Sequence, residues 1–329
     1  MGAQDFRWKT VDGGSAQPTL FDLPEREVGI GEYRGLEFLH VRAKRIINEV
    51  GAKSPVPFNY TINAYRGCSH ACVFCFARPT HEYLGLDPSV DFDRVIVVKT
   101  NAVEKLRAEL APGRWGGHHI AMGTNTDPYQ RAEGKYRLTR GIIEVLTAAR
   151  NPFSILTKGT LLLRDLDVLV EATKHTDVEL CFSIGTLDPE VWQATEPGTP
   201  HPRKRIEAVA KLNDAGVPCG VLVAPILPGL SDRHDQLDEV IGACVDAGAR
   251  SISPVLLHLR PGVREHYLGW LSEAHPELMA RHTRSYRRAY APAEERKRVS
   301  ATVRGLIADH RRRAGARTGP RLSSRFDPA

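Results

Sequence analysis

The chain has no run of apolar residues that approaches the length of a membrane span. Its first ten residues lack the apolar core of a secretory signal peptide, and Phe6 stands where a myristoylation signal needs Ser or Thr. These absences argue against an integral membrane protein, a secreted protein and a myristoylated anchor. With 42% hydrophobic and 26% charged residues over 329 positions, the composition is that of a globular protein with a sizeable core. We therefore predict a soluble, cytoplasmic protein with no membrane partner.

Cysteine is scarce, and its six residues are unevenly spread. Cys181, Cys219 and Cys244 are scattered among apolar residues, as is typical of buried, reduced thiols. The other three lie within eight residues of one another. This usage indicates a reducing compartment rather than a small secreted domain stabilised by disulfides.

The three clustered cysteines, Cys68, Cys72 and Cys75, form a C-x3-C-x2-C array. Disulfide geometry disfavours bridges inside so short a loop, and three thiols cannot all pair, so a metal centre fits them better. A structural zinc site and a closed iron–sulfur cube each take four protein ligands. With three, one iron of a cube would stay open to a small molecule. A zinc site completed by His70 or His81 is the alternative.

Apolar strands alternate with amphipathic helices along the middle of the chain. Parallel strands need crossover connections, so this alternation predicts an α/β fold with a parallel sheet. Six strands, fewer than the eight of a closed barrel, predict a partial, TIM-like (β/α)6 barrel. They lie at 58–64, 119–123, 153–158, 178–184, 217–225 and 251–257, with helices at 138–150, 163–174, 203–215 and 235–247. A further strand is predicted at 94–99, a helix at 101–110 capped by Asn101, and a helix turn before Gly51.

The cysteine array, with Phe74 directly before its third cysteine, resembles the signature of the radical S-adenosylmethionine (radical SAM) superfamily. Segments 65–79, 123–129 and 224–230 look more narrowly like the spore photoproduct lyase-related subgroup, also called DNA repair photolyase-like. The resemblance covers residues 55–260 and also implies a (β/α)6 barrel of the radical SAM type. It implies that the three cysteines hold a [4Fe-4S] cluster whose open iron chelates the methionine moiety of S-adenosylmethionine. An electron from an external donor of the flavodoxin or ferredoxin type then cleaves the sulfonium and gives a 5′-deoxyadenosyl radical.

Polar residues at the predicted strand ends are candidates for the cofactor site, because ligands of such barrels bind where the carboxyl ends of the strands meet. The resemblance implies that the 123–127 turn binds the methionine amino group and that Ile226 faces the adenine. At the other strand ends, the Lys158 cation suits the methionine carboxylate, and Ser183 suits a ribose hydroxyl or the carboxylate. The turn lacks the carboxylate of the superfamily's common Gly-Gly-Glu form, which leaves three acceptors open. The predicted cofactor-binding residues are Phe74, Gly123, Thr124, Asn125, Thr126, Asp127, Lys158, Ser183 and Ile226. The alternatives are solvated strand ends for Lys158 and Ser183, and the core for Ile226.

Beyond Arg260 only helices are predicted, so we expect three parts: an N-terminal extension (1–54, partly disordered), a radical SAM core (55–260) and a basic helical extension (261–329, with a disordered end). From position 281 to the end there are fourteen Lys and Arg against four Asp and Glu. Such a balance is typical either of a nucleic-acid footprint or of a solvated helical face. Arg281, Arg284 and Arg288 would form one helical stripe.

Two functions stay open at this point. The first is a radical SAM enzyme of lyase or oxidoreductase type that abstracts hydrogen from an unidentified substrate, with nucleic acid as a candidate. The second is an iron–sulfur or zinc-binding, nucleic-acid-associated protein without radical chemistry. His258 and Arg260, just past the sixth strand, are candidates for substrate contact. Spore photoproduct lyases carry a hydrogen-donating cysteine near the end of the second strand, where this chain has Met122, Gly123 and Thr124. We therefore do not predict spore photoproduct repair.

Overall fold

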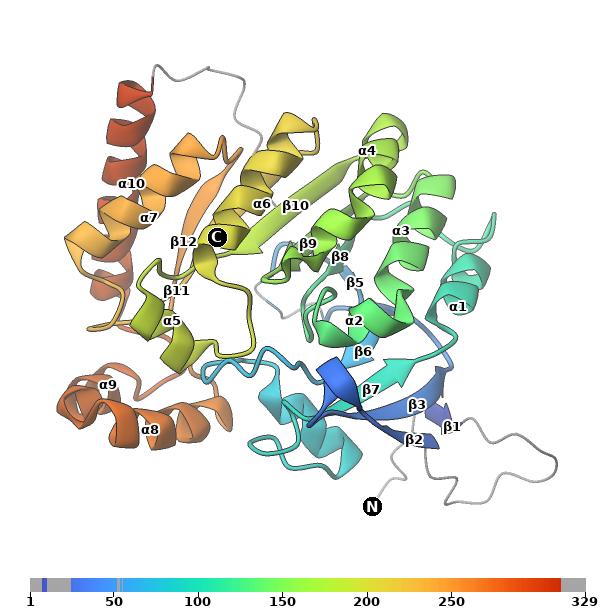
Figure 1. Cartoon of the computed structure of the whole chain (residues 1–329), viewed down its shortest axis with the longest axis horizontal. Helices are drawn as coiled ribbons and strands as arrows, with labels where there is room; N and C mark the ends of the chain where they lie inside the picture. Colours follow the sequence, from blue (N-terminus) through green and yellow to red (C-terminus); the bar gives the residue numbers. More distant parts are fainter. Residues whose placement is uncertain (1–7, 11–24, 52–53, 55, 315–329) are drawn as a thin grey trace.

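The computed structural model describes residues 8–10, 25–51, 54 and 56–314. Its main sheet has the strand order β12–β11–β10–β9–β8–β5–β4 (Figure 1). All neighbours pair in parallel except β4 (Ile47–Glu49), which is antiparallel to β5. The parallel strands are β5 (Tyr60–Ile62), β8 (Ile120–Met122), β9 (Phe153–Thr157), β10 (Val178–Ser183), β11 (Cys219–Ile226) and β12 (Ile252–Leu256). This open arc confirms the predicted α/β partial barrel.

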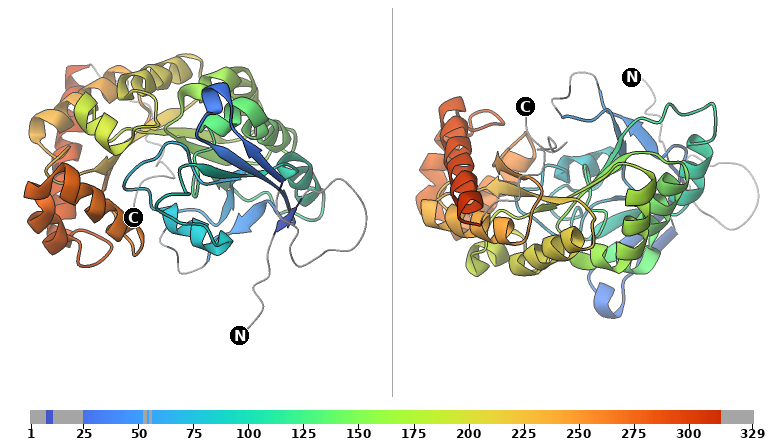
Figure 2. Two further views of the ribbon diagram at one scale, coloured as in Figure 1. Left: turned by 60° about the horizontal axis from the view of Figure 1, so that its bottom comes forward. Right: turned by 90° about the horizontal axis from the view of Figure 1, so that it is seen from above.

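Helices cover the outer side of this sheet (Figures 1 and 2). In α3, Ile142, Ile143 and Leu146 are buried at the three- and four-residue spacing of one helix face. Asn101 directly precedes α1 but makes no capping bond; its side chain accepts from the backbone N–H of Ala43 at 2.7 Å instead. The helices are α1 (Ala102–Glu109), α2 (Arg131–Tyr136), α3 (Leu138–Ala148), α4 (Leu166–His175), α5 (Pro189–Thr195), α6 (Pro202–Asp214) and α7 (His234–Asp246), with 3-10 segments η2 (Arg78–Leu84) and η3 (Thr160–Asp165).

A second sheet is built mainly from the segment before the cysteines. Its central strand β3 (Glu37–Ala43) is parallel to β7 (Val95–Lys99) and antiparallel to β1 (Trp8–Thr10) and β2 (Glu25–Val28), and β6 (Tyr65–Arg66) pairs with β7. A 3-10 turn, η1 (Gly31–Tyr33), precedes β3. The predicted strand at 94–99 therefore belongs to this sheet. The predicted helix turn before Gly51 is wrong, because pairing with β5 makes residues 47–49 the strand β4.

The C-terminal helices pack on the barrel. They are α8 (Val263–Ala274), η4 (Pro276–Leu278), α9 (Met279–Ser285) and α10 (Ala293–Arg313). Helix α10 lies beside α7 and β12 (Figure 1) and buries Val299, Val303 and Leu306 in the main core. Helices α8 and α9 form a second core with the cysteine loop. The end predicted to be disordered, 315–329, lies outside the described residues. No helix in the described part of the chain has the length and apolarity to cross a membrane.

Candidate active site

The cysteine loop, residues 67–78, follows β5 and the short strand β6. Gly67 opens it with a φ of 82°, and a Cβ there would lie 2.8 Å from the Val95 carbonyl oxygen, so only glycine fits. Cys68 and Cys72 are 6% and 7% exposed, whereas Cys75 is half-buried. Cys75 is therefore the most exposed of the three cysteines.

Arg78 fixes the far end of the loop. Its guanidinium donates to the Cys72 carbonyl through Nε at 3.2 Å and Nη2 at 3.1 Å, and Nη2 pairs with Asp93 Oδ2 at 2.7 Å. Arg78 is 1% exposed, and a buried charge needs such partners to be tolerated. The Arg-Pro pair at the end of the cysteine motif thus has a structural role.

The three thiols are held in surroundings that favour their neutral form. Burial raises the pKa of Cys68, and Asp127 adds to the effect. Burial also raises the pKa of Cys72, and the Glu196 carboxylate adds to the effect. Burial likewise raises the pKa of Cys75. Thiols bind metals as thiolates, so loading this site with a metal centre releases protons.

Each histidine of the zinc alternative has one ring nitrogen close to a protein oxygen. His81 Nε2 lies 3.0 Å from the Val95 carbonyl oxygen, and His70 Nδ1 lies 3.3 Å from Asp127 Oδ2. The other ring nitrogen of His81, Nδ1, is buried without a hydrogen-bond partner among the described residues. Within the described ranges, no three His, Cys, Asp or Glu side chains are grouped so as to hold one metal ion.

Asp127, at the end of β8, braces the loop against β9. Its carboxylate accepts from the Thr157 hydroxyl at 2.6 Å, the Lys158 backbone N–H at 2.7 Å and the Tyr129 backbone N–H at 2.8 Å. Burial alone would raise the pKa of this carboxyl, but His70, Thr157 and the Lys158 N–H lower it below its ordinary value. Asp127 is therefore committed to protein partners.

Thr126 and Gln130 complete this brace. The Thr126 hydroxyl donates to the Gly67 carbonyl at 2.6 Å. The Gln130 side chain donates to the same carbonyl at 2.8 Å and accepts from the Ser69 N–H at 3.0 Å. Gln130 is fully buried, and no periodicity or motif in the sequence singles it out.

The remaining residues of the 123–127 turn behave differently. Gly123 has a φ of 89°, and a Cβ there would collide with the carbonyl oxygen of Leu156. Asn63 fixes the turn by donating to the Thr124 hydroxyl at 3.2 Å and accepting from the Asn125 N–H at 3.1 Å. The Asn125 side chain is exposed and has no partner among the described residues, which makes it the acceptor of the turn that stays available to a ligand.

Lys158, Ser183 and Phe74 are brought together at the ends of β9 and β10. Lys158 Nζ donates to Ser183 Oγ at 2.9 Å and lies 5.6 Å from the centre of the Phe74 ring. It also donates to Glu196 Oε1 at 2.6 Å, and Glu196 Oε2 accepts from Arg205 Nη2 at 2.7 Å. Neither Glu196 nor Arg205 was predicted as a site residue. Glu196 lies between two predicted elements, and Arg205 lies near the start of α6.

Three other predicted positions lie apart from this group. Ile226 is fully buried in the main core, as its core alternative anticipated. His258 stacks on Tyr290, with ring centres 4.3 Å apart. Arg260 follows two residues later and has a buried Nε without a hydrogen-bond partner in the described structure.

The predicted arginine stripe does not form as one surface. Helix α9 ends at Ser285, before Arg288. Arg281 pairs with Asp232 at 2.9 Å and with Glu295 at 3.3 Å, which draws its charge into an ion-pair network. Exposed arginines therefore remain on the C-terminal segment, but not at the predicted helical register.

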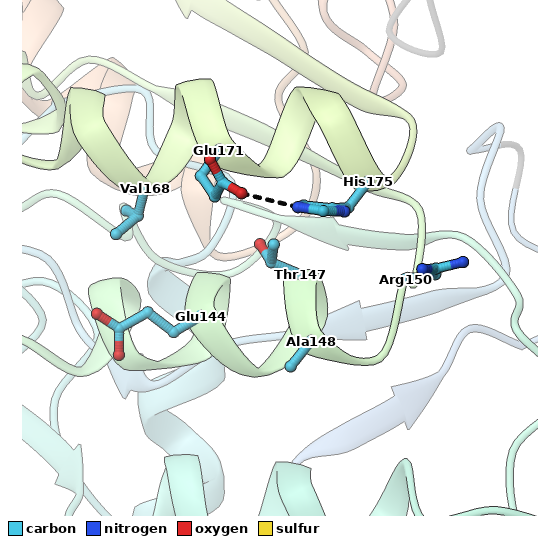
Figure 3. A pocket seen from close by; sticks show the side chains of 7 residues that line it. All are labelled: Glu144, Thr147, Ala148, Arg150, Val168, Glu171 and His175. Atoms are coloured by element: carbon cyan, nitrogen blue, oxygen red, sulfur yellow. Dashed lines mark hydrogen bonds and ion pairs between the residues drawn. The ribbon is translucent and has the colours of Figure 1, made fainter.

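A separate groove of about 420 Å³ lies between α3 and α4 (Figure 3). Figure 3 shows His175 directed at Glu171, where the two side chains bond at 2.7 Å. The groove is lined by Glu144, Thr147, Ala148, Arg150, Val168, Glu171 and His175. None of these belongs to the cysteine loop or the strand ends, so the groove is not part of the candidate site.

Residues 62–241 match the family model of the radical SAM superfamily. An uncharacterised protein of Mycobacterium tuberculosis is 45% identical over 296 residues, covering 90% of this chain and 87% of that protein. An uncharacterised protein of Methanocaldococcus jannaschii is 30% identical over 200 residues, covering 60% of this chain and 70% of its own length.

Among solved structures, a cysteine-to-serine variant of spore photoproduct lyase matches with a TM-score of 0.61 at 18% identity, over 83% of this chain and 79% of that one. Spore photoproduct lyase complexed with dinucleoside spore photoproduct matches with a TM-score of 0.59 at 19% identity, over 83% and 79%. At such identities the match concerns the fold. The family match over more than half of the chain goes further and confirms the resemblance seen at the cysteine array: the chain belongs to the radical SAM superfamily of enzymes.

Proposed function

We propose that this radical SAM enzyme holds a [4Fe-4S] cluster on Cys68, Cys72 and Cys75 and uses it to cleave S-adenosylmethionine reductively. The 5′-deoxyadenosyl radical so formed abstracts a hydrogen atom from the substrate. The observation that supports this most is the meeting of Phe74, from the cysteine loop, with Lys158 and Ser183 at adjoining strand ends. Thiol ligands and a cationic pocket for a carboxylate thus adjoin each other.

The donor set fits the cluster. The loop offers three thiols and no fourth, and each cysteine of a cube binds a different iron, so the sulfurs need not converge on one ion. When bound, such a cluster supplies the electron for sulfonium cleavage and an open iron for the methionine amino and carboxylate groups. The electron would come from an external donor of the flavodoxin or ferredoxin type, and Cys75 is the one cysteine of the loop that is half-buried and not buried.

The chain's own residues would bind and orient S-adenosylmethionine. The Lys158 ammonium and the Ser183 hydroxyl suit its carboxylate, and the exposed Asn125 amide oxygen suits its amino group. Phe74 belongs to an apolar cluster with Leu227 and Leu257, which would keep water from the reacting centre.

Electron paramagnetic resonance of the reduced, anaerobically reconstituted protein tests this assignment. Addition of S-adenosylmethionine should change the spectrum of the reduced cluster, because the open iron gains two ligands. A cluster spectrum that S-adenosylmethionine leaves unchanged would count against the proposal and favour an iron–sulfur protein without radical chemistry.

Nucleic acid is the substrate class that we propose. Tyr290 is 49% exposed, stacks on His258 beyond the end of β12 and lies 5.6 Å from the Arg296 guanidinium. Exposed Arg287 and Arg288 precede it by three and two residues in the sequence. Aromatic rings beside arginines are typical of surfaces that bind single-stranded nucleic acid. The resemblance in fold to a lyase complexed with dinucleoside spore photoproduct also favours this class. Spore photoproduct itself is not proposed, since β8 ends without a cysteine.

A further inference from the structure

A five-residue segment that begins at the last residue of α5, residues 195–199 with the sequence T-E-P-G-T, contacts both halves of the candidate site. Its backbone pairs with the cysteine loop: the Val73 N–H donates to the Thr195 carbonyl at 3.1 Å, and the Gly198 N–H donates to the His70 carbonyl at 3.0 Å. A Cβ at Gly198 would collide with the carbonyl oxygen of Ser69. The segment therefore packs directly on the loop that carries the three thiols.

The side chain of the same segment reaches the predicted carboxylate pocket. Glu196 is 4% exposed. Its Oε1 accepts from Lys158 Nζ at 2.6 Å and its Oε2 from Arg205 Nη2 at 2.7 Å. Although burial works against the anion, Lys158 and Arg205 lower the pKa of the Glu196 carboxyl. The carboxylate is thus a fixed negative charge between two cations.

Arg205 is itself fixed by the backbone around it. It is fully buried, and its remaining N–H groups donate to the Ser183 carbonyl at 2.8 Å and to the Pro200 carbonyl at 2.9 Å. Arg205 therefore sets the position of Glu196, and Glu196 sets the position of Lys158. The chain of contacts runs from α6 to the end of β9.

Lys158 keeps hydrogen-bonding capacity within this chain of contacts. Glu196 shares its charge between two cations, Lys158 and Arg205, and a second carboxylate, Asp127, accepts from the Lys158 backbone N–H. Lys158 Nζ has two short hydrogen bonds, to Ser183 and Glu196, whereas its third acceptor, the Ala224 carbonyl oxygen, is 3.5 Å away. A half-buried ammonium with one weak hydrogen bond is suited to receive one carboxylate of a ligand.

We infer that Glu196 is a positioning residue: it holds the Lys158 ammonium in place for the carboxylate of S-adenosylmethionine, and residues 195–198 tie that pocket to the cysteine loop. This inference rests on the function proposed above. It assigns the 195–199 segment a role in cosubstrate binding. The residue types of this segment alone do not indicate such a role.

The test is a double-mutant cycle on S-adenosylmethionine binding, measured by equilibrium dialysis with the iron-loaded full chain. Glu196→Gln removes the charge at nearly constant volume and should weaken binding about tenfold, the effect of losing one charge-assisted contact. If Glu196 acts through Lys158, adding Glu196→Gln to Lys158→Ala should weaken binding little beyond Lys158→Ala alone. Glu190→Gln, the same change at an exposed position on α5, should bind like the wild type.

A second variant keeps the test independent of the buried charge. Gly198→Ala leaves all three charged side chains in place but forces the segment away from Ser69, so it should accelerate iron loss under a chelator several-fold relative to the wild type. Thermal unfolding without iron shows whether Glu196→Gln and Gly198→Ala fold.

Three outcomes would overturn the inference. Glu196→Gln could bind S-adenosylmethionine as the wild type does, or bind it more tightly, which would make Glu196 a competitor of the ligand carboxylate. The third outcome is that the losses of binding free energy from Glu196→Gln and Lys158→Ala add fully in the double variant. If Glu196→Gln fails to fold, unchanged iron retention in Gly198→Ala overturns the proposed tie to the loop. Failure of the proposed function itself would be seen separately, as a wild-type protein that binds no S-adenosylmethionine.

Discussion

The ring of Phe74, one residue before the third cysteine of the loop, lies 5.6 Å from the ammonium of Lys158 at the end of β9. This contact joins the thiol-bearing loop to the strand ends where a cosubstrate would bind. Both sides are further braced, by Asp127 between the loop and β9 and by residues 195–198 between the loop and Lys158. The site is thus a set of contacts between segments remote in sequence.

Replacing Cys68, Cys72 or Cys75 singly by Ala should remove the iron chromophore, because each thiol would hold one iron of the cube. Wild-type protein purified without oxygen should contain about four irons per chain. The measurement is iron and sulfide content with the visible spectrum. Cys181→Ala, a buried thiol away from the loop, is the control and should keep full iron content.

Lys158→Ala should weaken S-adenosylmethionine binding while leaving the iron content unchanged, since the ammonium would touch the ligand and not the metal. A charge-assisted hydrogen bond contributes about 1.5–3 kcal/mol, which corresponds to about ten- to a hundredfold in affinity. Equilibrium dialysis measures the effect. The matched control is Lys174→Ala, which changes an exposed lysine on α4. Equal affinity of Lys158→Ala and Lys174→Ala for S-adenosylmethionine would show that Lys158 is a solvated strand-end lysine that does not contact the ligand.

Asp127→Asn should destabilise the apoprotein at neutral pH by about 1–3 kcal/mol, because three donors lose a charged acceptor. The folded-state pKa of Asp127 is lowered from the ordinary value of 3.8. Its contribution to the free energy of unfolding is therefore present above that value and is lost as the pH falls through the folded-state pKa.

Urea unfolding of wild type and variant across this range checks the prediction. The difference between them should shrink as the pH falls below about 4. Asp214→Asn, exposed at the end of α6, should have little effect at any pH. A difference that does not shrink below about pH 4 would contradict the assignment of Asp127 as a stabilising anion.

Charge reversal of Arg287 and Arg288 together should weaken nucleic-acid binding and reduce the steepness of its salt dependence, because phosphate contacts release counterions. Fluorescence anisotropy with a labelled single strand over a salt series gives both quantities. Reversal of exposed Arg203 on α6, which pairs with Glu239, serves as the control. If the wild type shows no salt-dependent binding to DNA or RNA, the substrate is a small molecule, a peptide or a protein.

Most of the fold was predictable from short-range patterns of apolar and polar residues. The six parallel strands follow short apolar runs that alternate with amphipathic helices, and each lies close to its predicted range. The packing of the C-terminal segment was harder to predict, since its positive charge suggests an appended, solvated tail. In the structure Val303 and Leu306 of α10 pack in the main core, so deleting everything after Gly262 would expose that core and could not test the basic charges alone.

The sequence singled out candidate site residues only where a residue's chemistry coincides with a local motif. The thiol spacing and the strand-end Lys158 met that condition, and their roles stay predictions. Gln130, Glu196 and Arg205 did not, because their roles come from partners far away in sequence, such as the Gly67 carbonyl for Gln130 and Lys158 for Glu196. Asp127 was one of three acceptors that the sequence left open for the ligand; in the structure its carboxylate accepts from the Thr157 hydroxyl and the Lys158 N–H and lies 3.3 Å from His70 Nδ1.

The most direct measurement is the formation of 5′-deoxyadenosine by the anaerobically reconstituted full chain, supplied with S-adenosylmethionine and a strong one-electron reductant. We predict 5′-deoxyadenosine and methionine in equal amounts from the wild type, and neither from a variant in which Cys68, Cys72 and Cys75 are all replaced by Ala. A colourless wild-type protein that holds stoichiometric zinc after anaerobic preparation and forms no 5′-deoxyadenosine would contradict the account.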